Sequence, residues 1–272
     1  MTDVAIPPID LSRYPIADDD PQTLRSLAAR YREHLDRQQH CSLPGFLRAD
    51  AIAALVDETL PLLPRANRAE SWRNCYLQRE KSPDLPDDHP RNRFNYASYH
   101  MIPADLFAAD SALKRLYYWQ PFQRLVAGIV GAKRLYPNED PLQPVNVICY
   151  SEGDQSAWHY DSTNAFTMTL MLQDSQRGGR FELAPNTRDG VDVEDIPYMQ
   201  AVLRGERERV ETVAREPGEL TIFRGCNSLH RVSRVEGEQR RLMAVFVYED
   251  EPGVRGDPEV NRTVYGRSGL VA

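Results

Sequence analysis

The sequence YSEGDQSAWHYD, residues 150–161, ends in His159-Tyr160-Asp161, and the run NSLH at residues 227–230 ends in His230. Side chains two residues apart in an extended segment point to the same side, so His159 and Asp161 can face one point. Together with His230 they supply two imidazoles and one carboxylate, the facial triad that holds non-heme Fe(II) and leaves coordination positions open. The sequence therefore predicts an iron site formed by these three residues.

A His-x-Asp pair alone arises by chance roughly one time in three in a chain of this composition, so its surroundings decide. The segments around it are short, apolar and bounded by turn residues, which is typical of antiparallel strands. They cover residues 145–150, 165–172, 179–183, 219–223 and 242–248. We expect these strands to form a barrel or jelly roll that carries the site.

The first half of the chain has helical periodicity instead. Apolar residues recur at helical spacing in residues 21–39, from Asp50 to about Pro61 and within 110–130, whereas 41–47 is strand-like. Residues 1–20 are predicted to be an extended surface arm, and the proline-rich segment 81–93 a mobile loop that closes over the pocket.

No low-complexity linker divides the two halves, so we expect one domain with an α+β fold. Its expected parts are residues 1–140 as mainly helical support and substrate loops, 141–250 as the β core and 251–272 as a C-terminal tail.

The composition excludes several classes of function. The 272 residues carry a formal net charge of -7 and a pI near 5.5, so no basic excess is present for binding nucleic acid. No apolar run approaches the ~18 residues of a membrane span, and no signal-peptide pattern is found. The four cysteines lack any CxxC spacing, which argues against zinc and disulfides. A cytoplasmic protein is expected.

The flanks of the motif carry a family resemblance. Tyr150 and Gly153 precede His159, and His230 is followed by Val232, Val235 and the pair Arg240-Arg241. This pattern, over residues 145–248, resembles the Fe(II)/2-oxoglutarate dioxygenase superfamily, particularly its prolyl-hydroxylase-like branch. The resemblance implies a double-stranded β-helix (jelly-roll, cupin-like) core buttressed by N-terminal helices. It also implies Fe(II), 2-oxoglutarate as co-substrate and O2.

The resemblance further implies roles for three residues around the triad. An arginine on the last strand should bind the distal carboxylate of 2-oxoglutarate, because a planar guanidinium accepts a carboxylate in two-point geometry. Arg240 and Arg241 must face opposite sides of that strand, so only one of them points inward. We favour Arg241, although the broader pattern also fits Arg240. Tyr150 is expected to donate a hydrogen bond to the co-substrate, and its alternative is a role in the core.

A narrower resemblance, to the free-amino-acid halogenases and hydroxylases, lies in residues 164–173, 178–182 and 265–267. Halogenating members replace the metal-binding carboxylate by a small residue, whereas this chain keeps Asp161, so hydroxylation is expected. Trp158 and Arg73 are the candidates for substrate binding. The alternatives are that Trp158 only closes the barrel mouth and that Arg73 is a solvated loop residue.

The expected function is hydroxylation of an unactivated C–H bond of a small polar molecule, such as a free amino acid or a derivative, with release of succinate and CO2. The same site chemistry also permits desaturation or cyclisation. Two alternatives stay open: a protein-residue (prolyl-type) hydroxylase, and a non-catalytic cupin-like metal-binding protein.

Overall fold

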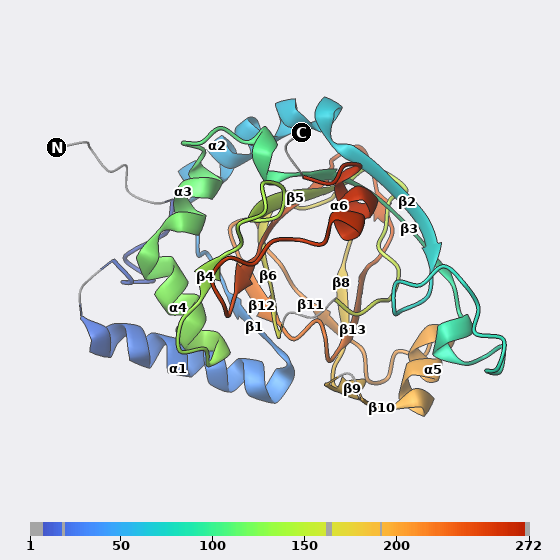
Figure 1. Ribbon diagram of the computed structural model, residues 1–272. Helices are drawn as coiled ribbons and strands as arrows, with labels where there is room; N and C mark the ends of the chain where they lie inside the picture. The colour runs from blue at the N-terminus through green and yellow to red at the C-terminus, as the bar shows by residue number, and fades with distance from the viewer. Residues whose placement is uncertain (1–7, 18–19, 162–164, 191, 270–272) are drawn as a thin grey trace.

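The computed structural model describes residues 8–17, 20–161, 165–190 and 192–269, and its centre is a seven-stranded antiparallel sheet (Figure 1). In spatial order its strands are β1 (His40–Leu43), β12 (Leu220–Phe223), β6 (Thr167–Gln173), β15 (Arg241–Phe246), β5 (Val145–Tyr150), β3 (Asn95–Ile102) and β2 (Asn67–Arg73). The four central strands come from the second half of the chain, and strands from the first half flank them on both sides.

A smaller antiparallel sheet faces the first, with the order β11 (Glu211–Val213), β8 (Phe181–Ala184) and β13 (Leu229–Val232). A buried cluster lies between the two sheets and contains Tyr150 and Phe223 from the large sheet and Phe181 and Val232 from the small one. Three short ladders pair β4 (Tyr136–Pro137) with β16 (Tyr248–Glu249), β7 (Arg177–Gly178) with β14 (Val235–Glu236), and β9 (Arg188–Asp189) with β10 (Val193–Glu194). The predicted α+β architecture with a barrel-like β core is confirmed.

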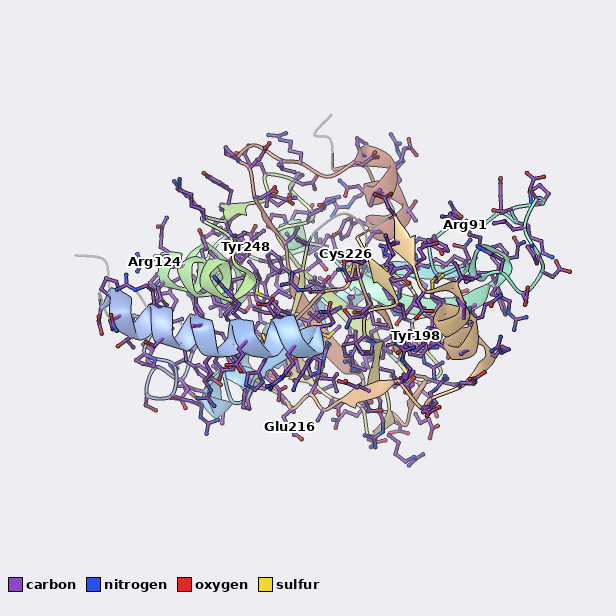
Figure 2. The ribbon with its side chains drawn as sticks, turned by 90° about the horizontal axis from the view of Figure 1, so that it is seen from below. Arg91, Arg124, Tyr198, Glu216, Cys226 and Tyr248 are labelled. Atoms are coloured by element: carbon purple, nitrogen blue, oxygen red, sulfur yellow. The ribbon has the colours of Figure 1, made fainter. Side chains whose placement is uncertain are left out.

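Helices from the first half cover the outer face of the large sheet (Figure 1). They are α1 (Pro21–Gln38), α2 (Ala49–Thr59), α3 (Ala112–Tyr118) and α4 (Gln120–Val130), close to their predicted ranges. Asp20 caps α1 by accepting hydrogen bonds from the amides of Gln22 and Thr23, while Asp19 lies outside the described residues. Figure 2 shows α1 lying across α4, with Tyr248 of the β core beside them.

Several elements were not predicted. The strands β2 and β3 join the large sheet, and α5 (Ile196–Arg204) and α6 (Pro258–Tyr265) lie in the second half. The remaining elements are the 3-10 helices η1 (Leu60–Arg65), η2 (Pro90–Asn92) and η3 (Ala104–Leu106). The strand β2 is an edge strand with alternating half-buried and exposed residues, and its sequence NRAESWR has too few apolar residues to reveal this alternation.

The described part of the N-terminal arm, residues 8–17, does not lie on the surface as predicted. Ile9, Tyr14 and Ile16 are each buried in the main core, and Ile9 forms a β-bridge with Leu47. The sequence of the arm contains Pro7, Pro8 and Pro15, and these prolines interrupt the periodicity that marks a packed segment, so the anchoring is not evident from the sequence. Residues 1–7 of the arm, and Asn164 of the halogenase-like stretch, lie outside the described residues.

The proline-rich loop 81–93 is folded around the buried amide of Asn92. This amide donates to the carbonyls of Ser82, Leu85 and Pro86 and accepts from the Ser82 amide. The loop lies beside α5, and Figure 2 shows Arg91 and Tyr198 of α5 on the same side of the molecule. Its closure over a pocket remains a prediction. Among the described helices, none is long and apolar enough to span a membrane.

Candidate active site

The two histidines of the motif are brought together by backbone pairing. After β5 the chain turns at Gly153, whose φ of 87° is one that side chains rarely tolerate. The His159 amide then donates to the His230 carbonyl at 3.0 Å, and the His230 amide donates to the His159 carbonyl at 3.1 Å. Residues opposite each other in an antiparallel pair share a face. The two imidazole rings consequently lie 4.3 Å apart between centroids.

Asp161 completes a compact set of metal-binding atoms. Its Oδ1 lies 3.6 Å from His159 Nε2 and 3.4 Å from His230 Nε2. His159 Nδ1 lies 2.7 Å from the Ala157 carbonyl, and His230 Nδ1 lies 3.0 Å from the Ser228 carbonyl. A carbonyl only accepts, so each Nδ1 carries the hydrogen and each Nε2 offers its lone pair. The structure thus brings the three predicted ligands together, and the donor set fits Fe(II).

The carboxylate of Asp161 is itself held in place. Thr167 Oγ1 donates a short hydrogen bond to Asp161 Oδ2, and the Asp161 amide donates to the Gly225 carbonyl at 3.0 Å. A Cβ atom at Gly225 would overlap Asp161 Oδ2, so a glycine is required there. These contacts orient the carboxylate toward the histidines.

The surroundings set the protonation states that metal binding requires. Burial lowers the pKa of His159 to about 3, and the neighbouring His230 adds to this effect. For Asp161 burial raises the pKa, but the two histidines and the Thr167 hydrogen bond outweigh it, and the net pKa lies below the usual value. At neutral pH His159 is a neutral imidazole and Asp161 is a carboxylate.

Trp158 was predicted to bind substrate, but the structure does not bring it to the triad. Its side chain is buried with Tyr198 and Met199 of α5, and the guanidinium carbons of Arg207 and Arg231 lie 5.5 and 4.9 Å from its ring centroid. Neighbouring side chains alternate in an extended segment, so the residue next to His159 faces away from the metal site. Trp158 therefore packs beneath α5.

The two arginines of the last strand are separated by the same alternation. Arg241 is fully buried on the inner face of β15, whereas Arg240 is exposed. Arg241 lies opposite Tyr150 of β5, whose pKa burial raises to about 12, so this phenol remains a hydrogen-bond donor at neutral pH. Of the predicted residues, Arg241 and Tyr150 share the barrel interior and Arg240 does not.

A second buried arginine, Arg215, is not evident from the sequence. It lies in the turn between β11 and β12 and is only 7% exposed. Its run Arg215-Glu216-Pro217-Gly218 has the composition of a solvated turn, so no sequence signal indicates its burial.

Arg73 ends β2 and is half-buried rather than solvated in a loop. Its Nε is buried without a hydrogen-bond partner among the described residues. Burial is the main cause of the lowered pKa of His159 and of the raised pKa of Tyr150. The charge of Arg73 adds to the lowering at His159 and opposes the increase in the pKa of Tyr150. The charge of Arg73 therefore acts on the site, and Arg73 also lies in the wall of a cavity of about 390 Å³ between β2 and α6.

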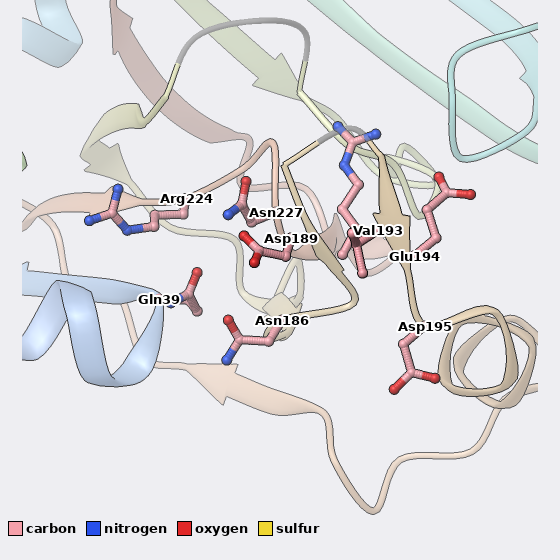
Figure 3. A pocket seen from close by; sticks show the side chains of 9 residues that line it. Gln39, Asn186, Asp189, Val193, Glu194, Asp195, Arg224 and Asn227 are labelled. Carbon is pink, nitrogen blue, oxygen red and sulfur yellow. The ribbon is translucent and has the colours of Figure 1, made fainter.

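Another cavity, of about 530 Å³, lies beside the loops that carry the triad, although no triad residue is among its described lining residues. Its wall carries Arg224 on one side and Glu194 and Asp195 on the other (Figure 3). Asn227, also in the wall, accepts a hydrogen bond from the Arg188 amide through its carbonyl. The cavity is polar and carries both signs of charge.

Solved structures with this fold are similar over most of the chain. An oxidoreductase of the 2OG-Fe(II) oxygenase family from Burkholderia pseudomallei is 15% identical, with a TM-score of 0.53 over 84% of this chain and 92% of the other. A prolyl hydroxylase from Trichoplax adhaerens, in complex with a hypoxia inducible factor peptide fragment, is 15% identical with a TM-score of 0.53 over 84% and 91%. HygX from Streptomyces hygroscopicus, with nickel, 2-oxoglutarate and hygromycin B bound, is 13% identical with a TM-score of 0.53 over 80% and 86%.

The fold and the His-Asp-His site are thus those of an Fe(II)/2-oxoglutarate-dependent oxygenase, and the predicted double-stranded β-helix is confirmed. Within this class the chain belongs to the halogenase D family, whose model matches residues 23–262. No curated protein sequence matches the chain.

Proposed function

We propose that the protein uses Fe(II), 2-oxoglutarate and O2 to hydroxylate an unactivated C–H bond of a small polar molecule, such as a free amino acid or a derivative. The overall change converts substrate, 2-oxoglutarate and O2 into hydroxylated substrate, succinate and CO2. The observation that carries the proposal is that Asp161 keeps its carboxylate within 3.6 Å of both histidine Nε2 atoms. Bound iron would supply the activation of O2.

The choice of hydroxylation over halogenation rests on the space beside the metal ligands. A halogenating site needs an open position for a halide in place of a carboxylate. Here the Asp161 carboxylate occupies that position and is fixed by Thr167. The family name therefore describes relatives of this chain, while its own ligand set supports oxygen transfer.

The residues of the barrel interior divide the remaining tasks. We assign Arg241 to the distal carboxylate of 2-oxoglutarate and Tyr150 to a hydrogen bond with the same molecule, because both are buried and lie opposite each other on neighbouring strands. Arg73 is assigned to a carboxylate of the substrate, since its buried Nε has no partner among the described residues and its charge reaches His159. A substrate held there lies on the β2 side of the triad.

The small-molecule class is supported by the polar cavities beside the triad-bearing loops and at Arg73, of about 530 and 390 Å³. Their volumes fall within the ~300–1,000 Å³ range of small-molecule sites. We also propose that the whole chain forms one catalytic domain, because one core cluster joins α1 and α4 to β5, β6 and β15.

The test is an anaerobic titration followed by turnover. Protein loaded with Fe(II) and 2-oxoglutarate is expected to show a visible charge-transfer band, and admission of O2 with a panel of amino acids should give substrate-stimulated succinate and a product heavier by one oxygen atom. Asp161→Ala should lose the band. A band of unchanged intensity in that variant contradicts the ligand set.

The panel is run with and without chloride. A chlorinated product overturns the preference for hydroxylation, and turnover of peptides but not of amino acids favours the protein-residue alternative. Arg73→Met should raise the KM for an amino-acid substrate by about 100-fold, the cost of losing a buried charge-assisted contact. Arg124→Met changes an exposed arginine of α4, away from the loop 81–93. It is the matched control and should change the KM by less than about twofold, as expected of an exposed residue.

A further inference from the structure

Two arginines are buried at one place in the barrel interior. Arg241 in β15 is 0% exposed, and Arg215 before β12 is 7% exposed. Arg215 Nη1 lies 3.1 Å from the sulfur of Met243, and both Nη atoms of Arg241 lie 3.7 Å from the same sulfur. Two like charges therefore converge on one thioether.

The protein compensates these charges only in part. Among the described residues no carboxylate forms an ion pair with Arg215, although the charges of Glu219 and Asp161 act on it from farther away. Arg215 Nε and Nη2 and Arg241 Nε have no hydrogen-bond partner in the described part of the chain. The acid beside Arg241 is the half-exposed Asp174, at 3.9 Å from Nε. Burial lowers the pKa of both guanidinium groups, and at Arg215 the charge of Arg241 adds to this effect. Unpaired buried charges of one sign are destabilising, so their retention calls for an anionic ligand.

The arginine pair is connected to the metal site by two aromatic rings. The guanidinium carbon of Arg215 lies 3.5 Å from the ring centroid of Phe181 and 5.4 Å from that of Phe223. These rings lie 5.8 and 4.9 Å from the His230 ring. Arg215 is thus separated from a metal ligand by one layer of aromatic side chains. Arg215 and Arg241 also line the same cavity of about 270 Å³.

We propose that Arg215 and Arg241 together bind the distal carboxylate of 2-oxoglutarate, so that Arg215 is a second cation of the co-substrate site and selects a dicarboxylic oxoacid. The inference rests on the proposed function and deepens it. A carboxylate has about four lone-pair positions and can accept from two guanidinium groups at once. The aromatic layer of Phe181 and Phe223 holds Arg215 in position and keeps water from its face.

The competing explanation is structural: Arg215 fills space against Phe181 and Met243 and contacts no ligand. The two explanations differ in what Arg215→Met does to the empty protein. If the arginine is kept for a ligand, removing its unpaired charge leaves the melting temperature of the metal-free protein unchanged or raises it. If the arginine is structural, the same change lowers the melting temperature.

The experiment makes two measurements. The first is the melting temperature of the metal-free protein. The second is the dissociation constant of 2-oxoglutarate for the anaerobic Fe(II) protein, measured from the intensity of the visible charge-transfer band. Arg215→Met is expected to raise the dissociation constant of 2-oxoglutarate at least about tenfold, which corresponds to the loss of one charge-assisted hydrogen bond. The same substitution should raise the dissociation constant of 2-oxopentanoate by less than about twofold, because this oxoacid lacks the distal carboxylate and loses no contact. Arg241→Met should behave in the same way, and the exposed Arg240→Met is the matched control.

An unchanged 2-oxoglutarate dissociation constant in Arg215→Met overturns the inference while Arg241→Met still tests the proposed function. Equal weakening of both oxoacids also overturns it. If Arg215→Met does not fold, Arg215→Lys decides: a point charge cannot replace a planar guanidinium, so weaker binding supports the inference and unchanged binding overturns it. If the wild-type protein shows no band with 2-oxoglutarate, both the proposed function and the inference fail.

Discussion

Arg241 lies directly across from Tyr150 in the β15–β5 ladder, and its guanidinium carbon is 5.7 Å from the centre of the tyrosine ring. The pairing places a cation and a phenol on the same inner face of the barrel. Burial raises the pKa of Tyr150 to about 12, so the phenol keeps its proton at physiological pH. A carboxylate held by Arg241 has a hydrogen-bond donor within reach on the neighbouring strand.

Tyr150→Phe should weaken 2-oxoglutarate binding by about tenfold, since a hydrogen bond to a charged group contributes ~1.5–3 kcal/mol. Binding to the wild-type protein should not depend on Tyr150 ionisation up to about pH 10 and should weaken only as the pH rises toward the raised pKa. The measurement is the anaerobic titration at several pH values. Tyr99→Phe is the control, because Tyr99 of β3 packs beside Tyr150 with 6.0 Å between the two ring centroids. Equal losses in both variants would indicate a packing effect.

Thr167 should control metal affinity without touching the metal. Thr167→Val removes the hydroxyl that donates to Asp161 Oδ2 and should lower the affinity for Fe(II), or for Co(II) as an air-stable probe, by ~10–100-fold. Thr167→Ser keeps the donor and should stay close to wild type. Competition with a chelator measures both variants. A serine variant as weak as the valine variant would show that the methyl group matters more than the hydrogen bond.

Whether the sequence predicts a site residue depends on knowing which alternate side chains of its strand point into the barrel. His159 and Asp161 share a face by their spacing, and the structure confirms that they meet His230. The choice between Arg240 and Arg241 required the register of β15 against β5. Trp158 and Arg73 were both candidates for substrate binding in the sequence. In the structure Trp158 packs against α5, because it alternates with His159, whereas the charge of Arg73 acts on His159.

The parts that the sequence did not predict lack a local signal. The strands β2 and β3 are held by partners distant in sequence, since β3 pairs with β5, and β2 is a polar edge strand. Arg215 lies in a run with the composition of a solvated turn, and its burial follows only from the packing of Phe181 and Met243 against it. The strongly apolar strand β5 was predicted at its observed limits.

The four cysteines should differ in reactivity. Burial raises the pKa of Cys41, Cys75 and Cys149 to about 12, so these thiols are protonated and inaccessible in the folded protein. Cys226 is only half-buried, and its thiol donates to Asn227. Because burial also raises the pKa of Cys226, its labelling by a thiol reagent should be slow and should accelerate as the pH rises. Mass spectrometry of native and urea-unfolded protein would count one and four labelled cysteines; rapid native labelling of Cys149 would contradict the burial of β5.

The helical layer behind the barrel depends on a close approach of α1 to α4. A Cβ atom added at Gly128 would lie 2.6 Å from the Cβ of Ala28, which is closer than two methyl groups can pack. Gly128→Ala therefore sets two effects against each other. Alanine improves helix propensity by ~1 kcal/mol, whereas overpacking costs ~1–3 kcal/mol, so the variant should be destabilised overall. Urea unfolding gives the free energy of unfolding. The double variant with Ala28→Gly and Gly128→Ala should recover the stability lost through overpacking. If its free energy of unfolding equals the value expected from adding the two single effects, the helices move apart instead.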